Sequence, residues 1–180
     1  MRKLSIVLLG LSLLATACES RKTTDATQTS DTATATPVTD NSASNVATLT
    51  PRLQALGLTP DHAWQNVNLG DDFSALKANA KAEPFEQDVK HVGYTTEFDN
   101  LESVDYQYFQ DNGKINKIQV DLYLNTAQSV ADYKKDLITY LTGKYGSAAS
   151  IAQGSSWQQG KVTLLDVSKG KDFGLRLVIK

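Results

Sequence analysis

The sequence predicts an α+β fold, in which an antiparallel sheet of about six strands is packed on one face by one long helix and by short N-terminal helices. Two observations carry this prediction. Residues from about 89 to 124, and again from 157 to 179, alternate apolar and polar side chains as half-buried strands do. Between these groups, residues 126–145 repeat apolar side chains at steps of three or four, which is typical of an amphipathic helix.

The first 18 residues, MRKLSIVLLGLSLLATAC, have the pattern of an export signal. Arg2 and Lys3 precede an apolar run over residues 4–14, which is too short to span a bilayer. Small residues follow, and then Cys18, the single cysteine of the chain. This stretch resembles the lipobox of bacterial lipoproteins, in which the cysteine is acylated and becomes the new N-terminus. The alternative is a secretory signal whose cysteine happens to lie at the cleavage site.

The lipobox resemblance implies a location. Residues 1–17 would be removed as a signal peptide, and lipid on Cys18 would anchor the chain to a membrane of the bacterial cell envelope. Glu19 follows the cysteine where inner-membrane lipoproteins of enteric bacteria carry aspartate, so the resemblance favours the outer membrane. With Cys18 acylated, no disulfide can form within the chain.

Residues 18–49 combine Cys18 with a segment rich in Ser, Thr, Ala and Asp that contains no aromatic residue. Such a segment cannot bury enough apolar surface to offset the entropy of ordering it, so we expect a disordered tether. Residues 50–180 are expected to form a single α+β domain. Of the 18 basic side chains, two lie in the leader, which leaves 16 against 20 acidic ones. This balance argues against nucleic acid as a partner.

The domain is expected to begin with short elements. Thr50-Pro51 and Thr59-Pro60 each predict a helix start, with threonine as the N-cap and proline at the first helical position. Residues 64–69 alternate apolar and polar side chains, as in a short strand or extended segment. Asp72 then caps another short helix. Its apolar positions are Phe73, Leu76 and Ala80.

Three strands are expected next: residues 89–98, a strand that places Val104, Tyr106 and Tyr108 on one face, and a strand that does the same with Ile118, Val120, Leu122 and Leu124. Asn112-Gly113 predicts a type I′ turn between the second and third. Asn125 and Gln128 resemble a capping box at the start of the long helix, and Gly146 ends it. Three more strands are predicted at Trp157, residues 162–167 and residues 173–179.

The sequence predicts neither catalysis nor a cofactor. His91 near Glu86 and Asp88 is the combination closest to a metal site, but one imidazole and two irregularly spaced carboxylates fall short of a ligand set. No serine lies in a Gly-x-Ser-x-Gly elbow. We therefore expect no catalytic residue, no metal and no cofactor, and a chain that is not an enzyme.

Two aromatic residues are candidates for a partner or ligand surface. Tyr123 falls on the polar face of its predicted strand, and Phe109 points to the face opposite to that of Tyr108. If the long helix covers one face of the sheet, both would lie on the uncovered face, where aromatic side chains suit a protein partner or a glycan. The alternative interpretation is cross-strand pairing that stabilises the sheet.

The order of elements on a lipidated N-terminus, with a Leu69-Gly70 turn, resembles the small periplasmic lipoprotein domains of the BamE and β-lactamase-inhibitor-protein kind. The resemblance covers residues 59–180 and implies interaction with an envelope protein rather than catalysis. We therefore expect a membrane-anchored, non-enzymatic interaction protein. The alternative is a binding module for a small ligand or glycan, which requires a cavity lined by aromatic residues. A curved sheet wrapped around the helix to form such a pocket is the structural alternative.

A faint internal echo links residues 109–115 with residues 157–162: each places an aromatic residue before a glycine turn, and a lysine with a β-branched residue after it. A duplication would explain the echo. Two hairpins that need the same turn chemistry are the explanation that we favour.

Overall fold

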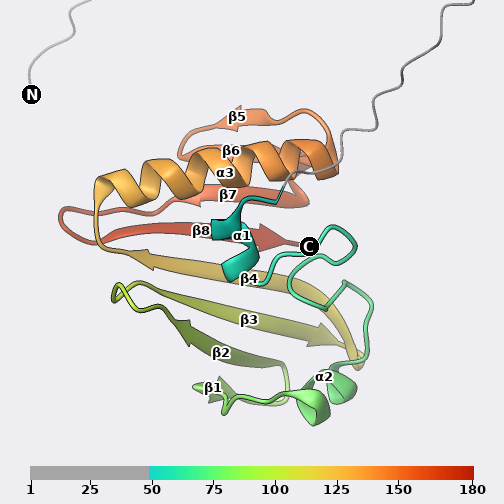
Figure 1. Cartoon of the computed structure of the whole chain (residues 1–180). Coiled ribbons are helices and arrows are strands. Elements are labelled where there is room, and N and C mark those ends of the chain that lie inside the picture. The colour runs from blue at the N-terminus through green and yellow to red at the C-terminus, as the bar shows by residue number, and fades with distance from the viewer. Residues whose placement is uncertain (1–48) are drawn as a thin grey trace, which may run out of the picture. The chain divides into compact units, whose positions relative to one another are not determined.

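The computed structural model describes residues 49–180. This part of the chain is α+β, with an eight-stranded antiparallel sheet in the order β1-β2-β3-β4-β8-β7-β6-β5 (Figure 1). The strands are β1 (Glu86–Gln87), β2 (His91–Glu97), β3 (Ser103–Asp111), β4 (Lys114–Leu124), β5 (Ala149–Ile151), β6 (Gly154–Trp157), β7 (Val162–Asp166) and β8 (Phe173–Ile179). The helices are α1 (Pro51–Ala55), α2 (Phe73–Asn79) and α3 (Ala127–Tyr145), with a 3-10 turn over Gln158–Gly160.

The predicted fold class is confirmed, but the expected count of about six strands is wrong. The two additional strands, β1 and β5, lie at the two edges of the sheet. They contain two and three residues, all exposed. A strand this short shows no alternation of apolar and polar residues, so the sequence pattern could not reveal it.

The sheet consists of two four-stranded meanders that meet where β4 pairs with β8. The predicted turn at Asn112-Gly113 is confirmed, with φ of 51° and 79°. The two echo segments fall on the β3–β4 and β6–β7 hairpins. The first hairpin joins the third and fourth strands of one meander, and the second joins the second and third strands of the other. Because these hairpins are not equivalent, shared turn chemistry accounts for the echo better than duplication does.

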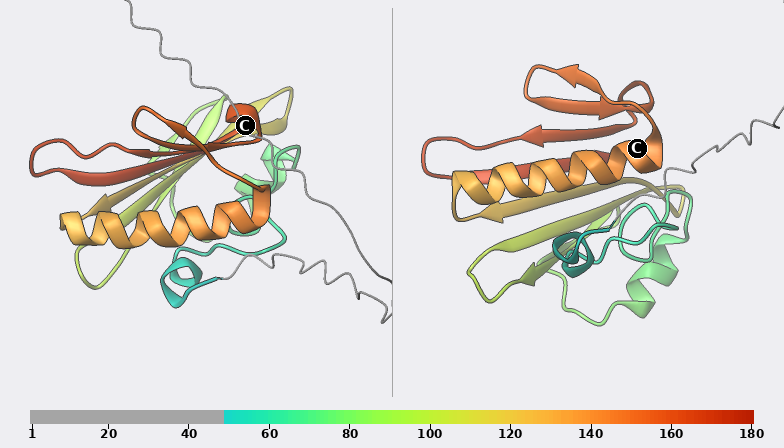
Figure 2. Two further views of the ribbon diagram at one scale, coloured as in Figure 1. Left: turned by 90° about the horizontal axis from the view of Figure 1, so that it is seen from above. Right: turned by 45° about the horizontal axis from the view of Figure 1, so that its top comes forward.

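One face of the sheet carries the core. Directly paired residues on the central strands form apolar rows, such as Tyr106 on β3, Val120 on β4, Leu177 on β8 and Leu164 on β7. All four side chains are buried. Helix α3 packs mainly against β4, β6, β7 and β8, and Figure 2 shows α1 on the same side of the sheet.

The opposite face of the sheet is polar and carries no helix (Figure 2). We call it the open face. It displays the alternate residues of the same strands, including Asp105 on β3, Asp121 on β4 and Arg176 on β8. The guanidinium of Arg176 pairs with the carboxylate of Asp121, and this contact raises the pKa of the arginine.

The segment before α2 departs from two predictions. Helix α1 begins as predicted, with the Thr50 hydroxyl accepting the amide of Leu53. The helix predicted at Thr59-Pro60 and the strand predicted at residues 64–69 are both wrong, because this region forms turns. Fully buried Trp64 and the tight bridge from Trp64 to Val67 fix these turns. Tertiary packing therefore overrides the local pattern.

Two helix starts follow from side-chain caps. Asp72 caps α2 as predicted, because its carboxylate accepts the amide of Ala75 at 3.0 Å. The long helix α3 is capped one residue later than predicted: Thr126, rather than Asn125, accepts the amide of Ser129 at 3.0 Å. Gly146 ends α3 at a φ of 86°, as predicted.

Candidate functional site

A cleft of about 680 Å³ opens on the core face of the sheet, over β2 and β3. Helix α3 packs mainly on the other half of the sheet, so here the residues around α2 cover the strands instead. Three tyrosines form the floor of the cleft, and we call it the tyrosine cleft. It is lined by Gln65, Asn66, Val67, Asp71, Asp72, Ala75, Leu76, Asn79, Ala80, Lys81, Ala82, Tyr94, Tyr106, Tyr108 and Ile115.

Strand register brings the three floor tyrosines together. Tyr94 on β2 pairs directly with Tyr106 on β3, and Tyr108 follows two residues later on the same face. The ring centroids of Tyr94 and Tyr106 lie 5.8 Å apart, and those of Tyr106 and Tyr108 lie 5.9 Å apart in an edge-on arrangement. The rings pack tightly, leaving 4%, 9% and 1% of these residues exposed. The floor is therefore a rigid aromatic layer.

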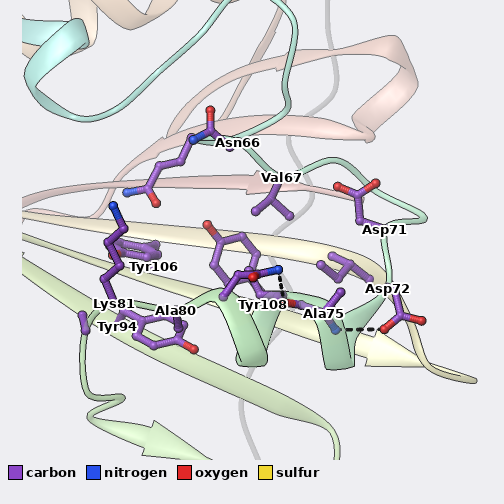
Figure 3. Close-up of a pocket in the computed structure, with 15 residues that line it drawn as sticks. Asn66, Val67, Asp71, Asp72, Ala75, Ala80, Lys81, Tyr94, Tyr106 and Tyr108 are labelled. Carbon is purple, nitrogen blue, oxygen red and sulfur yellow. Dashed lines mark hydrogen bonds between the residues drawn. The ribbon is translucent and has the colours of Figure 1, made fainter.

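All three tyrosines line the cleft, and Figure 3 shows the hydroxyl of Tyr108 on the side where Asn66 lies. Among the described residues, none of these three hydroxyls has a hydrogen-bond partner, and none is sealed away from the cleft as a buried orphan. The hydroxyl of Tyr140, in contrast, donates to the carbonyl of Thr59 at 2.7 Å. Figure 3 shows the floor tyrosines beneath Asn66 and Val67. None of the three hydroxyls is therefore a fully enclosed polar atom without a partner.

Burial raises the pKa of two of the floor tyrosines. It raises the pKa of Tyr108 far above that of a free tyrosine, and the neighbouring tyrosines raise it further. Burial and the proximity of Tyr106 also raise the pKa of Tyr94. At neutral pH, both phenols stay protonated, so each can donate one hydrogen bond and accept others. They are unsuited to act as bases or nucleophiles.

One wall of the cleft is α2, which the β3–β4 hairpin holds in place. The amide of Gly70 donates to the carbonyl of Ile115 at 2.7 Å, and the amide of Phe73 donates to the carbonyl of Gly113 at 3.0 Å. The amide of Ile115 returns a bond to the carbonyl of Asp71 at 3.0 Å. Backbone bonds thus fix the wall, and its position does not depend on exposed side chains.

The two ends of the cleft differ in charge (Figure 3). Asp71 and Asp72 lie at one end, where both serve the local structure. Asp72 caps α2, and the Oδ2 atom of Asp71 accepts the amide of Asn68 at 2.7 Å. Lys81 lies at the other end and forms no ion pair within residues 49–180. Asp71 and Asp72 form no ion pair within these residues either, so the lining carries two carboxylates at one end and one ammonium at the other.

Sequence reasoning missed this site in part. It placed Tyr106 and Tyr108 on one face of a strand, and it expected a strand over residues 89–98, which contains Tyr94. The signal in the sequence that could have indicated the cleft is the presence of three tyrosines on the inward faces of two neighbouring strands. What covers them was not predictable, because it depends on the turns of residues 59–70.

Phe109 and Tyr123 both lie on the open face, but at opposite ends of the β3–β4 pair. The Phe109 ring stacks on His91 at 5.4 Å, and the Lys117 ammonium lies 3.4 Å from its centroid. Tyr123 is 53% exposed. The two residues therefore do not form one surface, and Tyr123 is the freer of the two.

Both ring nitrogens of His91 contact carboxylates. Its Nε2 atom lies 3.1 Å from Glu86, and its Nδ1 atom lies 3.0 Å from Asp88. Within residues 49–180, no group of three or more His, Cys, Asp or Glu side chains is arranged to hold a metal ion. The pair of contacts instead ties β1 and the turn before β2 to the sheet.

Cys18, the leader and the predicted tether up to residue 48 lie outside the described residues, so lipidation stays a prediction. Within residues 49–180, no helix combines the length and the apolar character needed to cross a membrane. Comparison with family models, with curated proteins and with solved structures gives no match to this chain. The resemblance to BamE and β-lactamase-inhibitor-protein domains also stays a prediction.

Proposed function

We propose that this chain is a lipid-anchored, non-enzymatic binding module of the bacterial envelope that holds a small ligand in the tyrosine cleft. The observation that carries the proposal is the set of three buried tyrosines that line the cleft and whose hydroxyls form no hydrogen bond within residues 49–180. A volume of about 680 Å³ lies within the usual range for small-molecule sites. Aromatic walls with a few fixed polar groups are the common lining of such sites.

The energetics of the floor support ligand binding. A hydroxyl that a ligand buries without a partner costs about 1–3 kcal/mol, so a ligand that pairs with the hydroxyls of Tyr94, Tyr106 and Tyr108 avoids a cost that an apolar ligand would incur. The tyrosines are already packed against one another, so binding would order few additional side chains. Preorganisation of this kind favours affinity.

A fragment screen by ligand-observed NMR on the full chain in detergent micelles tests the cleft. Ala75 lines the cleft on α2, and Ala75→Trp should fill it and abolish fragment binding. Ala131→Trp, at an exposed position on α3 outside the cleft, is the matched control and should leave binding unchanged. Fragments that bind the Ala75→Trp protein as well as the wild type would contradict the proposal, as would a screen without hits.

The anchor has its own test. Metabolic labelling with an alkyne-tagged fatty acid should tag the wild-type chain and should not tag Cys18→Ser. Fractionation should place the wild type with the outer membrane. A wild-type chain that is released in soluble form without label would favour the alternative of an ordinary secretory signal.

A protein partner on the open face is the second candidate function, and one observation favours it. Tyr123 and Val167 are 53% and 41% exposed, and they flank Gly174, which has no side chain. An uncovered apolar pair on a polar face suits a protein contact. A photo-crosslinker at Tyr123 should capture one saturable partner, whereas the same probe at Phe109, held between His91 and Lys117, should not. Absence of a crosslink at Tyr123 would contradict this candidate.

A further inference from the structure

We infer that the ligand of the tyrosine cleft is a short zwitterionic peptide in an extended conformation. Its terminal ammonium lies at the end of the cleft that carries Asp71 and Asp72, and its terminal carboxylate lies beside Lys81. This inference rests on the proposed function, because it names the chemical class for the same cleft. Three observations lead to it: the opposite charges of the two ends, the distance between these ends and the unpartnered polar groups of the floor.

The two ends of the cleft carry opposite charges. Asp71 and Asp72 line one end and Lys81 lines the other (Figure 3), and none of the three forms an ion pair within residues 49–180. Lys114 lies outside the lining and is joined to Asp72 by a β-bridge. Even with Lys114 counted, the acidic end keeps one net negative charge. A simple anion or a simple cation would meet a like charge at one end, whereas a zwitterion matches both ends.

Both carboxylates at the acidic end can accept from an ammonium. Asp71 uses its Oδ2 atom for the amide of Asn68, and Asp72 uses its Oδ1 atom for the amide of Ala75 and the hydroxyl of Ser74. Each carboxylate therefore has a second oxygen that the local structure does not need. An ammonium has three donors and no acceptor, so it can pair with these oxygens.

The separation of the two ends matches an extended peptide of about three or four residues. Asp72 and Ala80 are the caps of α2, and Lys81 follows directly. The eight steps from Asp72 to Ala80, at about 1.5 Å each, place the ends on the order of 12 Å apart. An extended chain advances about 3.3–3.6 Å per residue. A single amino acid, whose ammonium and carboxylate share one carbon atom, would reach only one end.

The floor supplies partners for the peptide groups. Tyr94 and Tyr108 are only 4% and 1% exposed, and their hydroxyls form no hydrogen bond within residues 49–180. Figure 3 shows the hydroxyl of Tyr108 on the side where Asn66 lies. A phenol and a side-chain amide each donate and accept, so they can pair with the C=O and the N–H of a peptide group. These buried hydroxyls point to a ligand independently of the charged ends.

The apolar residues of the lining favour small apolar side chains on the peptide. Val67 belongs to the turns before α2, Ala75 and Leu76 to α2, and Ile115 to β4. Methyl groups of a ligand can be buried against these side chains, whereas charged side chains would lose their hydration there without a partner. Trialanine therefore has the expected charges, length and side chains.

Isothermal titration of the full chain in non-ionic detergent micelles tests the inference. The probes are trialanine, N-acetyl-trialanine, trialanine amide, the doubly blocked peptide and free alanine. Trialanine should bind most tightly, and each block should weaken binding about fivefold, which is the ratio that an exposed ion pair of ~1 kcal/mol gives. Free alanine, which carries both charges but cannot span the cleft, should bind more weakly than trialanine.

Matched variants assign the two ends. Lys81→Met should remove the difference between trialanine and its amide and should keep the effect of N-acetylation. The double variant Asp71→Asn with Asp72→Asn should do the reverse, because asparagine keeps a capping oxygen but not the charge. Lys77→Met and Asp99→Asn, both outside the lining, should change neither effect. Equal binding of trialanine and both singly blocked peptides to the wild type would overturn the inference.

The outcomes separate the inference from the proposed function. If the doubly blocked peptide or free alanine binds as tightly as trialanine, or if fragments of another class bind in the cleft and no peptide does, the peptide inference fails and the proposed function stands. If no probe and no fragment binds, both fail. A loss of trialanine binding in Ala75→Trp, but not in Ala131→Trp, would support both.

Discussion

Replacing Leu177 with alanine should test whether β8 is the central core strand of the sheet. Leu177 is fully buried and pairs with Val120 on β4 and Leu164 on β7, both also buried. Leucine-to-alanine changes at buried positions cost about 2–5 kcal/mol, and the cost is higher where the site cannot collapse. Hydrogen-bonded strands on both sides restrict collapse here, so we expect about 3–5 kcal/mol. That is a large part of the ~5–15 kcal/mol typical of a domain.

The neighbouring residue supplies the control. Val178 lies on the open face, where it pairs with Gln119 and Thr163 and is only partly buried. Val178→Ala should therefore cost less than about 1 kcal/mol. Urea unfolding, followed by the fluorescence of the buried Trp64 and Trp157, measures both. With a slope of ~1.5 kcal/mol per molar urea, Leu177→Ala should lower the midpoint by about 2–3 M. Equal shifts for the two variants would refute the assignment of the faces.

Three further predictions follow from the same structure. Removing residues 176–180 takes most of β8 from between β4 and β7, so the cooperative thermal transition in circular dichroism should disappear, and a retained transition would argue against a central β8. Gly113→Ala should lower the free energy of unfolding by about 1 kcal/mol because Gly113 has a φ of 79°, and an unchanged urea midpoint would contradict this. Burial alone would raise the pKa of Glu102, but hydrogen bonds from Ser129, Asn100 and the amide of Asn125 outweigh it, so its pKa is lowered from 4.5. A lowered carboxyl pKa contributes stability above the unfolded value and loses it as the pH falls through the folded value. The destabilisation by Glu102→Gln should therefore shrink between pH 6 and pH 3 in urea titrations, and a gap that stays constant would refute this reading.

The parts of the fold that could be predicted from sequence are the strands and the helix in which apolar residues recur at a regular spacing. Strands β3, β4 and β8 alternate buried and outward residues, and α3 repeats its buried residues at helical spacing. These local signals agree with the tertiary structure, so the elements and their buried faces follow from them. The pairing of β4 with β8 does not, because α3 and three strands separate the two in the sequence. The turn between β3 and β4 could also be predicted, because Asn112 and Gly113 adopt positive φ as their residue types suggest.

Residues 59–70 could not be predicted because distant contacts determine their path. The carbonyl of Thr59 accepts the hydroxyl of Tyr140 and the ammonium of Lys144, both on α3. The indole of Trp64 is fully buried, and its Nε1 atom has no partner among the described residues. The contacts of Thr59 with α3 and the burial of Trp64 hold this segment in turns, instead of the helix and the strand that Thr59-Pro60 and residues 64–69 favour locally. Part of the cover of the tyrosine cleft, residues 65–67, comes from this segment, which is one reason why the sequence did not reveal the cleft.

The residue types along one row of directly paired strand residues nevertheless indicate where the cleft lies. One continuous row runs from Tyr94 on β2 through Tyr106, Val120 and Leu177 to Leu164 on β7. A helix is about 10–12 Å wide and strands are about 4.8 Å apart, so α3 alone covers only two or three strands of such a row. The row is aliphatic on β4, β8 and β7, against which α3 packs, and it is phenolic on β2 and β3. Aliphatic side chains require a dry partner such as a helix, whereas a tyrosine can bury its ring and keep its hydroxyl in a polar space. The change from leucine and valine to tyrosine along one row therefore marks the boundary between the core and the cleft, and it is what the proposed binding of a polar ligand requires.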